Sequence, residues 1–132
     1  MWHKHLDNNY FISKLYDEVP EIIDTEIINI QINHEGEEFT ISFMMPRYAD
    51  NPPKKWILAN NNSIIVELDL SEIEELTLTY NSKELLSGDI KIELNDNGLL
   101  DVSISGTVNL TFKAYAGYIQ SVKGLIVETF EK

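Results

Sequence analysis

Apolar and polar residues alternate with a period of two along most of the chain, a pattern typical of β-strands that are buried on one face. A strand over 25–33 would place its isoleucines Ile28, Ile30 and Ile32 on one face. The alternation resumes over 39–43 after a turn that contains Gly36. Because glycine accepts the positive φ of a tight connection, these two segments are predicted to form a hairpin.

Six further segments share the same alternation, which brings the prediction to about eight strands. They cover 64–70, 76–80, 90–94, 100–104, 108–112 and 122–130. Asn97-Gly98 favours a primed turn between the third and fourth of them. Since the connections are short and lack βαβ spacing, the predicted fold class is mainly β (β-rich α+β), as an antiparallel sandwich or a strongly curved sheet.

The period changes only near the start, where three- and four-residue spacing predicts one N-terminal helix. The apolar stripe of this helix would comprise Phe11, Leu15, Tyr16 and Val19. Asn8 or Asn9 would cap it, and Pro20 cannot continue it because proline lacks an amide donor. The length fits a single domain over 1–132, in which we expect residues 1–7 to be frayed.

The segment 46–56, PRYADNPPKKW, interrupts the alternation and holds three of the four prolines and three of the ten basic residues. Pro52-Pro53 favours extended backbone. Two interpretations follow: either Trp56 closes one end of the core while the prolines cross between sheets, or the basic side chains and Tyr48 form a binding loop.

Charge narrows the class of partner, because the net charge is −12 and the excess of acids is spread over both halves. Residues 1–66 carry five bases and ten acids, and residues 67–132 carry five bases and twelve acids. Such a surface repels phosphate backbones and anionic membranes, so we expect neither nucleic acid nor a membrane as partner. It favours a basic protein, although acidity can also serve solubility alone.

Cysteine is absent, which excludes a disulfide framework and a thiolate zinc site. The N-terminus lacks the apolar region of a secretory signal, so the expected location is cytoplasmic.

Candidate chemistry is sparse, and the sequence predicts a protein that is not an enzyme. Neither Ser87-Gly88 nor Ser105-Gly106 has the nucleophile-elbow form. His3 and His5 are too close to the chain end to indicate a metal site, and no cofactor-binding motif is present. The acids after residue 66 indicate a solvated strand edge and a candidate partner-binding surface more than an acid–base pair. These acids are Glu67, Asp69, Glu72, Glu74 and Glu75.

Several spaced motifs together resemble the immunity protein 50 family of bacterial polymorphic toxin systems. They include Tyr16-Asp17-Glu18-Val19-Pro20, Glu35-Gly36, Phe43-x-x-Pro46, Pro52-Pro53-Lys54-Lys55-Trp56, the leucine series from Leu68 to Leu78, Ile104-x-Gly106 and Val122-x-Gly124. The loop that marks the family comprises Pro46, Pro52, Pro53, Lys55 and Trp56. The resemblance covers residues 10–127, and the order of the motifs carries it more than any single one.

This resemblance implies a cytoplasmic protein that binds and neutralises a cognate toxin by steric and electrostatic occlusion, and a basic nuclease would suit the acidic surface. It fixes neither the toxin nor the oligomeric state. The alternative is a non-catalytic β-rich binding or structural module for a peptide or carbohydrate, in which Tyr48 and Trp56 would line an open groove.

Overall fold

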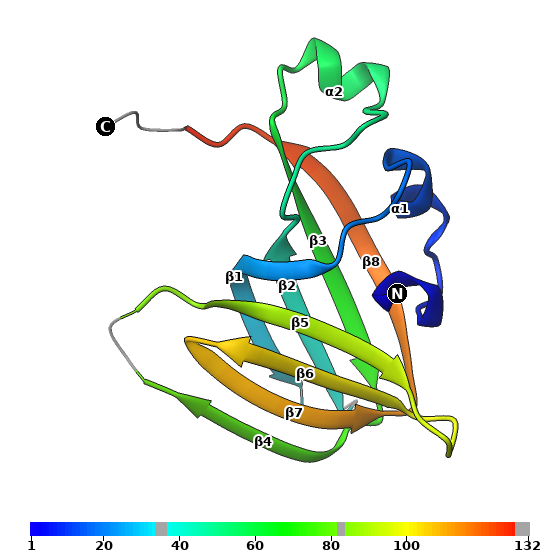
Figure 1. The fold of residues 1–132 in the computed structure, drawn as a ribbon, viewed down its shortest axis with the longest axis vertical. Helices are drawn as coiled ribbons and strands as arrows, with labels where there is room; N and C mark the ends of the chain where they lie inside the picture. Colours follow the sequence, from blue (N-terminus) through cyan, green and yellow to red (C-terminus); the bar gives the residue numbers. More distant parts are fainter. Residues whose placement is uncertain (34–36, 82–83, 129–132) are drawn as a thin grey trace.

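A computed structural model describes residues 1–33, 37–81 and 84–128 of the 132-residue chain (Figure 1). Within these ranges the strands are β1 (Ile22–Asn33), β2 (Glu38–Met44), β3 (Ser63–Ser71), β4 (Glu74–Tyr80), β5 (Ser87–Leu94), β6 (Leu100–Gly106), β7 (Val108–Ala114) and β8 (Ala116–Leu125). The helical segments are short: η1 (Trp2–His5), α1 (Tyr10–Leu15) and α2 (Lys54–Leu58). None of the helices in the described ranges is long and apolar enough to cross a membrane.

All eight strands belong to one antiparallel sheet in the order β4-β7-β6-β5-β1-β2-β3-β8. The prediction of a mainly β fold is therefore confirmed, and of the two architectures the strongly curved sheet is the observed one. β1 pairs with β5 through Glu26 and with β2 from Ile27 onward, and its register shifts in both ladders. These shifts bend β1 so that the sheet folds over on itself.

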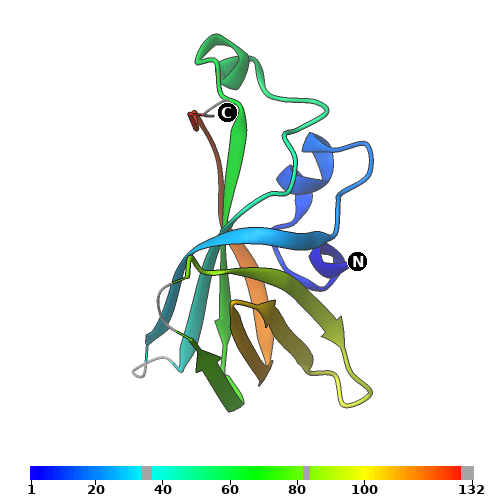
Figure 2. The ribbon, with the colours of Figure 1, turned by 60° about the vertical axis from the view of Figure 1, so that its left-hand side comes forward.

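The bend divides the sheet into two parts that we name by their inner strands. The β3 half-sheet comprises β1, β2, β3 and β8, and the β6 half-sheet comprises β5, β6, β7 and β4. Figures 1 and 2 show the strands of the β6 half-sheet running across those of the β3 half-sheet, with α1 and α2 at one end of the molecule.

The core lies between the inner faces of the two half-sheets. In β3 every second residue from Ile64 to Leu70 is buried, as the period-two pattern predicts. Phe39 of β2 and Phe112 of β7 meet across this core with ring centroids 4.6 Å apart. Burial of large apolar side chains from both half-sheets holds the folded-over sheet together.

The N-terminal segment differs from its prediction, because residues 1–7 are not frayed. Trp2 and Leu6 are each only 2% exposed. The indole Nε1 of Trp2 donates to the carbonyl of Pro20 at 3.0 Å, and its ring meets Phe43 edge to face. Sequence periodicity could not show this, since the burial comes from contacts with distant parts of the chain.

The predicted helix is present but shorter, and its buried stripe is different. α1 buries Ile12 and Leu15, whereas Phe11 is 43% exposed. Asn9 occupies the N-cap position, but its side-chain amide donates to the carbonyl of His3 instead of capping the helix. Tyr16 already has extended backbone, so the helix ends well before Pro20.

Three details of the strands also depart from expectation. Ile27 is buried in place of Ile28, because the register of β1 against β2 shifts between Ile27 and Asn29. Between β5 and β6 only Gly98 has a positive φ, at 79°, which excludes a primed turn centred on Asn97-Gly98, because both primed forms require a positive φ at the first central residue. β8 spans Ala116–Leu125 instead of 122–130. The predicted turn at Gly36 and the strand end at Phe130 lie outside the described residues.

Candidate interaction surface

The outer face of the β3 half-sheet carries two rows of polar side chains that run across all four strands. Because paired residues in neighbouring strands point to the same face, the pairing of the strands defines these rows. One row is Gln31, Thr40, Asp69 and Tyr118, and the next is Asn29, Ser42, Glu67 and Ser121. Each row has one carboxylate, and both carboxylates come from β3.

Both carboxylates accept hydrogen bonds from hydroxyl groups. The Thr40 hydroxyl donates to Asp69 at 2.7 Å, and the Ser42 hydroxyl donates to Glu67 at 3.3 Å. The hydroxyl of Tyr118 also hydrogen-bonds to Asp69, and this contact, with the negative charge of Asp69, raises the pKa of Tyr118 above its ordinary value. The hydrogen bonds fix the carboxylates in place without neutralising them.

Cations are scarce around these two acids. Lys123 is the single basic residue in the four strands of the β3 half-sheet, where it pairs with Ile65. Within the described ranges, neither Glu67 nor Asp69 forms an ion pair. Glu38, which starts β2, adds to the negative charge that acts on Tyr118. The outer face of the β3 half-sheet is therefore a fixed, uncompensated negative surface.

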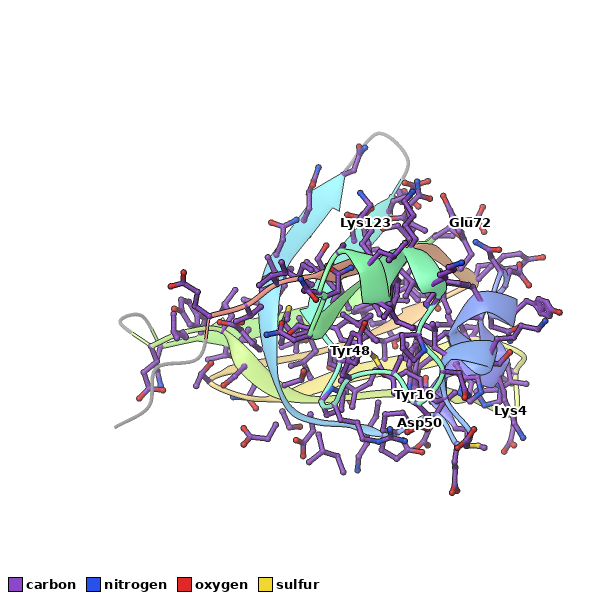
Figure 3. All side chains as sticks on the ribbon, turned by 90° about the horizontal axis from the view of Figure 1, so that it is seen from above. Lys4, Tyr16, Tyr48, Asp50, Glu72 and Lys123 are labelled. Carbon is purple, nitrogen blue, oxygen red and sulfur yellow. The ribbon has the colours of Figure 1, made fainter. Side chains whose placement is uncertain are left out.

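The other three predicted acids lie elsewhere. Glu72 lies in the connection between β3 and β4, and Glu74 and Glu75 begin β4. Glu75 forms an ion pair with Lys113 at 2.6 Å. The five predicted acids thus separate into two groups, and Glu67 and Asp69 lie on a strand between β2 and β8, not at a sheet edge. Figure 3 marks Glu72 and Lys123 on the side-chain view.

The outer face of the β6 half-sheet differs from this surface. It contains a depression of about 460 Å³ with both lysines and acids in its wall. The charged residues that line it are Glu75, Lys91, Glu93, Asp101 and Lys113. Asp101 pairs with Lys113 across β6 and β7, so positive and negative groups alternate there.

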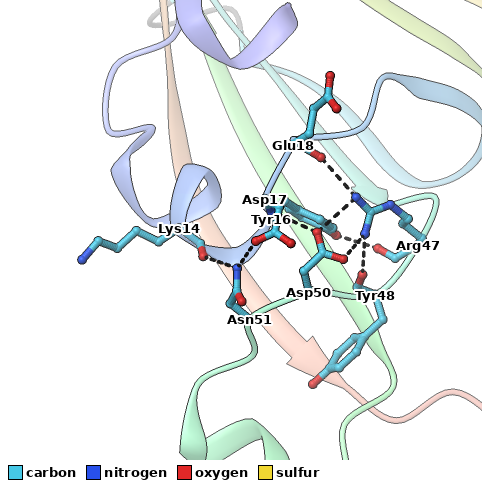
Figure 4. A network of polar contacts seen from close by, with 8 residues as sticks. All are labelled: Lys14, Tyr16, Asp17, Glu18, Arg47, Tyr48, Asp50 and Asn51. Carbon is cyan, nitrogen blue, oxygen red and sulfur yellow. Dashed lines mark hydrogen bonds and ion pairs between the residues drawn. The ribbon is translucent and has the colours of Figure 1, made fainter.

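The loop that marks the family is held by a polar network close to its start (Figure 4). Arg47 Nη1 lies 2.7 Å from Asp50 Oδ1, and Arg47 Nη2 donates to the carbonyl of Glu18 at 3.1 Å. The other oxygen of Asp50 accepts from the amide of Asp17 at 3.0 Å. The hydrogen bond to Arg47 keeps the pKa of Asp50 below its ordinary value. These contacts tie the loop to the connection between α1 and β1.

A second set of contacts in the same loop is buried. The Tyr16 hydroxyl donates to the carbonyl of Arg47 at 2.6 Å, and burial raises the pKa of Tyr16 to about 12. Trp56 is 9% exposed and contacts the rings of Phe11 and Tyr48. A Cβ on Gly124 would come within 2.7 Å of the Trp56 ring, so β8 depends on glycine at this close approach.

Trp56 therefore closes one end of the core, as the first of the two interpretations predicts, but the prolines do not cross between sheets, because they connect β2 and β3, which are paired neighbours in one sheet. Pro46 and Lys55 are exposed, and Pro52 and Pro53 are half-buried. Lys54 and Lys55 are the first two residues of α2, a helix that the sequence did not predict. The open aromatic groove that a peptide- or carbohydrate-binding module would need is not formed by Tyr48 and Trp56, since they pack against each other and the core.

Sequence reasoning missed the polar rows and the contribution of Glu38. The alternation in β3 does place Glu67 and Asp69 outward, but the rows arise only when β8 lies beside β3, and these strands are distant in sequence. No group of three or more potential metal ligands occurs among residues 1–33, 37–81 and 84–128.

Comparison with protein families finds one described as immunity protein 50, whose model matches residues 8–125. Comparison with curated proteins and with solved structures finds no match.

Proposed function

Because the chain belongs to the immunity protein 50 family, which implies neutralisation of a toxin by a protein that is typically non-catalytic, we propose that it blocks its cognate toxin by steric and electrostatic occlusion. The contact surface in this proposal is the outer face of the β3 half-sheet, and the toxin is a basic protein. A nuclease fits this description, since nucleases that act on phosphate backbones carry basic surfaces. The place of action is the cytoplasm.

The observation that carries the proposal is the pair Glu67 and Asp69, held by hydroxyl groups and without an ion pair among the described residues. Repulsion between neighbouring carboxylates opposes folding, so a surface that keeps them fixed and uncompensated is better suited to a cationic partner than to stability. Approach of a basic toxin would satisfy both carboxylates at once and would be accelerated by the net charge of −12.

The test measures binding of the toxin domain encoded beside this gene to the wild-type chain and to two double variants. Glu67→Gln with Asp69→Asn removes two charges from the proposed surface. Glu93→Gln with Asp101→Asn removes the same charge from the outer face of the β6 half-sheet and serves as the matched control. We expect the first pair to weaken binding about 10- to 100-fold, mostly at low salt, and the second to weaken it less than about 3-fold.

Equal losses in both pairs would show that only net charge matters and would contradict the assignment of the surface. Absence of any complex with the wild-type chain would contradict the proposed function itself.

A further inference from the structure

Among the described residues, β8, β4 and the second half of β1 each have one edge without a neighbouring strand, and the edges of β8 and β4 are partly covered or protected. The edge of β8 is covered by the N-terminal segment from Gly117 to Ile119, where the amide of Asp7 donates to the carbonyl of Gly117 at 2.9 Å and the amide of Ile119 donates to the carbonyl of Asp7 at 3.0 Å, and Lys123 places a charge farther along it. The edge strand β4 begins with two charged residues and has a register shift between Glu74 and Thr77. Charges and irregular pairing are common protections of an edge against unwanted pairing.

The third edge lies along β1 from Ile28 to Ile32 and, within the part of the chain that the structure describes, has neither protection. On the β5 side, the described backbone hydrogen bonds of β1 run as far as the amide of Ile27, which donates to the carbonyl of Leu86 at 2.9 Å. Among the described residues, β1 pairs only with β2 from Ile28 to Ile32. No charged residue and no proline occurs in this stretch, although the chain as a whole is rich in charge.

The side chains at this edge extend the core surface into solvent. Ile30 and Ile32 pair with Ile41 and Phe39, which are fully buried, so all four point to the inner face. Ile32 is nevertheless 53% exposed. A further strand beside β1 would cover it.

Exposed apolar side chains from the other half-sheet also lie on the inner face. Leu78 and Tyr80 of β4 pair with the buried residues Leu110 and Val108, and they are 44% and 41% exposed. The open side of the curved sheet therefore presents apolar groups from both half-sheets, and such surfaces mark interaction sites in soluble proteins.

We propose that the free edge of β1 between Ile28 and Ile32 receives an extended segment of the cognate toxin as an additional strand, and that this segment alternates apolar with basic residues. The inference rests on the proposed function and adds to it the place and the mode of binding. Backbone hydrogen bonds to β1 provide affinity, and alternate side chains provide specificity, as in other cases of strand addition.

Charge complementarity selects the occupant. The neutral stretch is bordered by Glu26 on β1 and by Glu38 at the start of β2, which favours basic side chains on the outward positions of the added strand. A second copy of this chain would bring another net charge of −12 to the same edge, which opposes self-pairing. An added strand also extends the outer face that carries Glu67 and Asp69, so the body of the toxin would lie over these carboxylates.

The test compares substitutions of two exposed isoleucines, Ile32 at the edge and Ile57 on α2, which are 53% and 58% exposed. Ile32→Lys and Ile32→Asp are each expected to weaken binding of the toxin domain encoded beside this gene at least about 10-fold, because either charge would be buried by the added strand. Ile57→Lys and Ile57→Asp are expected to change it less than about 3-fold. If Ile32 acted through charge alone, its aspartate variant would bind the basic toxin more tightly than wild type.

Amide hydrogen exchange gives a second readout that does not depend on substitution. We expect residues 28–32 to exchange more slowly when the toxin domain is bound, and Ile28→Lys provides a further variant if Ile32→Lys does not fold by circular dichroism.

Three results would overturn the inference in different ways. Unchanged binding by the Ile32 variants, with unchanged exchange at residues 28–32, would reject the edge and leave the proposed function standing. A wild-type dimer in sedimentation that Ile32→Lys dissociates would show that a second copy occupies the edge. Failure of wild type to bind the toxin would reject both proposals.

Discussion

The strands of the two half-sheets hold equal numbers of acids, but these acids have different partners. The four strands of the β6 half-sheet hold five acids and two lysines, and Lys113 is paired with Glu75 there. Those of the β3 half-sheet hold five acids and one lysine, and Glu67 and Asp69 contact hydroxyl groups instead of cations. Net charge alone therefore does not locate a binding surface. The hydrogen-bond and ion-pair partners of each carboxylate distinguish the two half-sheets.

The half-sheets also differ in what supports them at the end where the helices lie. The β3 half-sheet is closed there by Trp56, which packs against Gly124 of β8, and the β6 half-sheet has no equivalent cover from α2 (Figure 1). Trp56→Ala is expected to lower the free energy of unfolding by about 3–5 kcal/mol, since it removes a buried indole and leaves a cavity. Urea denaturation would measure the loss.

Leu58→Ala is the control for this substitution, because Leu58 belongs to the same helix but is 74% exposed. Its expected effect is within about 0.5 kcal/mol. Equal effects of the two substitutions would mean that α2 as a whole, and not the indole, closes the core.

Two glycines, one in each half-sheet, sharpen the comparison because their neighbours differ in rigidity. A Cβ on Gly106 of β6 would lie 2.1 Å from the backbone oxygen of Ser87, whereas one on Gly117 of β8 would meet the side-chain ends of Leu70 and Leu6 at 2.7 and 2.8 Å. Backbone cannot yield as side chains can. Gly106→Ala is therefore expected to destabilise the fold by about 2–3 kcal/mol and Gly117→Ala by about 1 kcal/mol.

Thermal and urea unfolding of both alanine variants would check this order. The opposite order would indicate that β6 and β5 can separate at Gly106, and that the side chains around Gly117 are the more rigidly packed.

The alternation of residues was sufficient to predict most of the strands and the outward direction of Glu67 and Asp69, but not the bounds of β8 or the register shift in β1. It could not predict the polar rows, because a period of two does not specify which strands are neighbours, and β8 reaches β3 from a distant part of the chain. The burial of Trp2 escaped prediction for a similar reason: its local sequence is polar, and its partners Pro20 and Phe43 are remote. Trp56 was ambiguous because two lysines precede it.

A spectroscopic prediction addresses the β3 half-sheet directly. Since the hydrogen bond to Asp69 is the largest cause that raises the pKa of Tyr118, Asp69→Asn is expected to return that pKa toward 10. In the wild type the folded state favours the neutral phenol of Tyr118. The contact therefore stabilises the fold fully below the pKa that Tyr118 has in the unfolded chain, and this stabilisation is lost as the pH rises through the pKa of Tyr118 in the folded chain. NMR titration of tyrosine ring carbons would measure the shift.

Tyr16 is the internal control in the same titration, because burial raises its pKa to about 12 and Asp69 is not among the causes. We expect its signal to be unchanged in Asp69→Asn. A simultaneous shift of both tyrosines would indicate a change of fold rather than loss of one hydrogen bond.

The smallest expected effect is also the most direct comparison of the two faces, because it concerns a sign. Glu75→Gln removes a carboxylate that is paired with Lys113, so a slightly lower Tm is expected. Glu67→Gln removes a carboxylate that repels its neighbours and keeps an oxygen that can accept from Ser42, so a slightly higher Tm is expected. Each shift should be about 1–2 °C at low salt and should shrink in 0.5 M salt, where charges on the surface are screened.

If Glu67→Gln raises the Tm and also weakens binding of the toxin domain, then the acids of the β3 half-sheet are retained at the expense of stability, which is what a surface kept for a partner requires. A lower Tm for Glu67→Gln would mean that Glu67 has a structural role, and the difference between the two faces would then no longer support a binding surface.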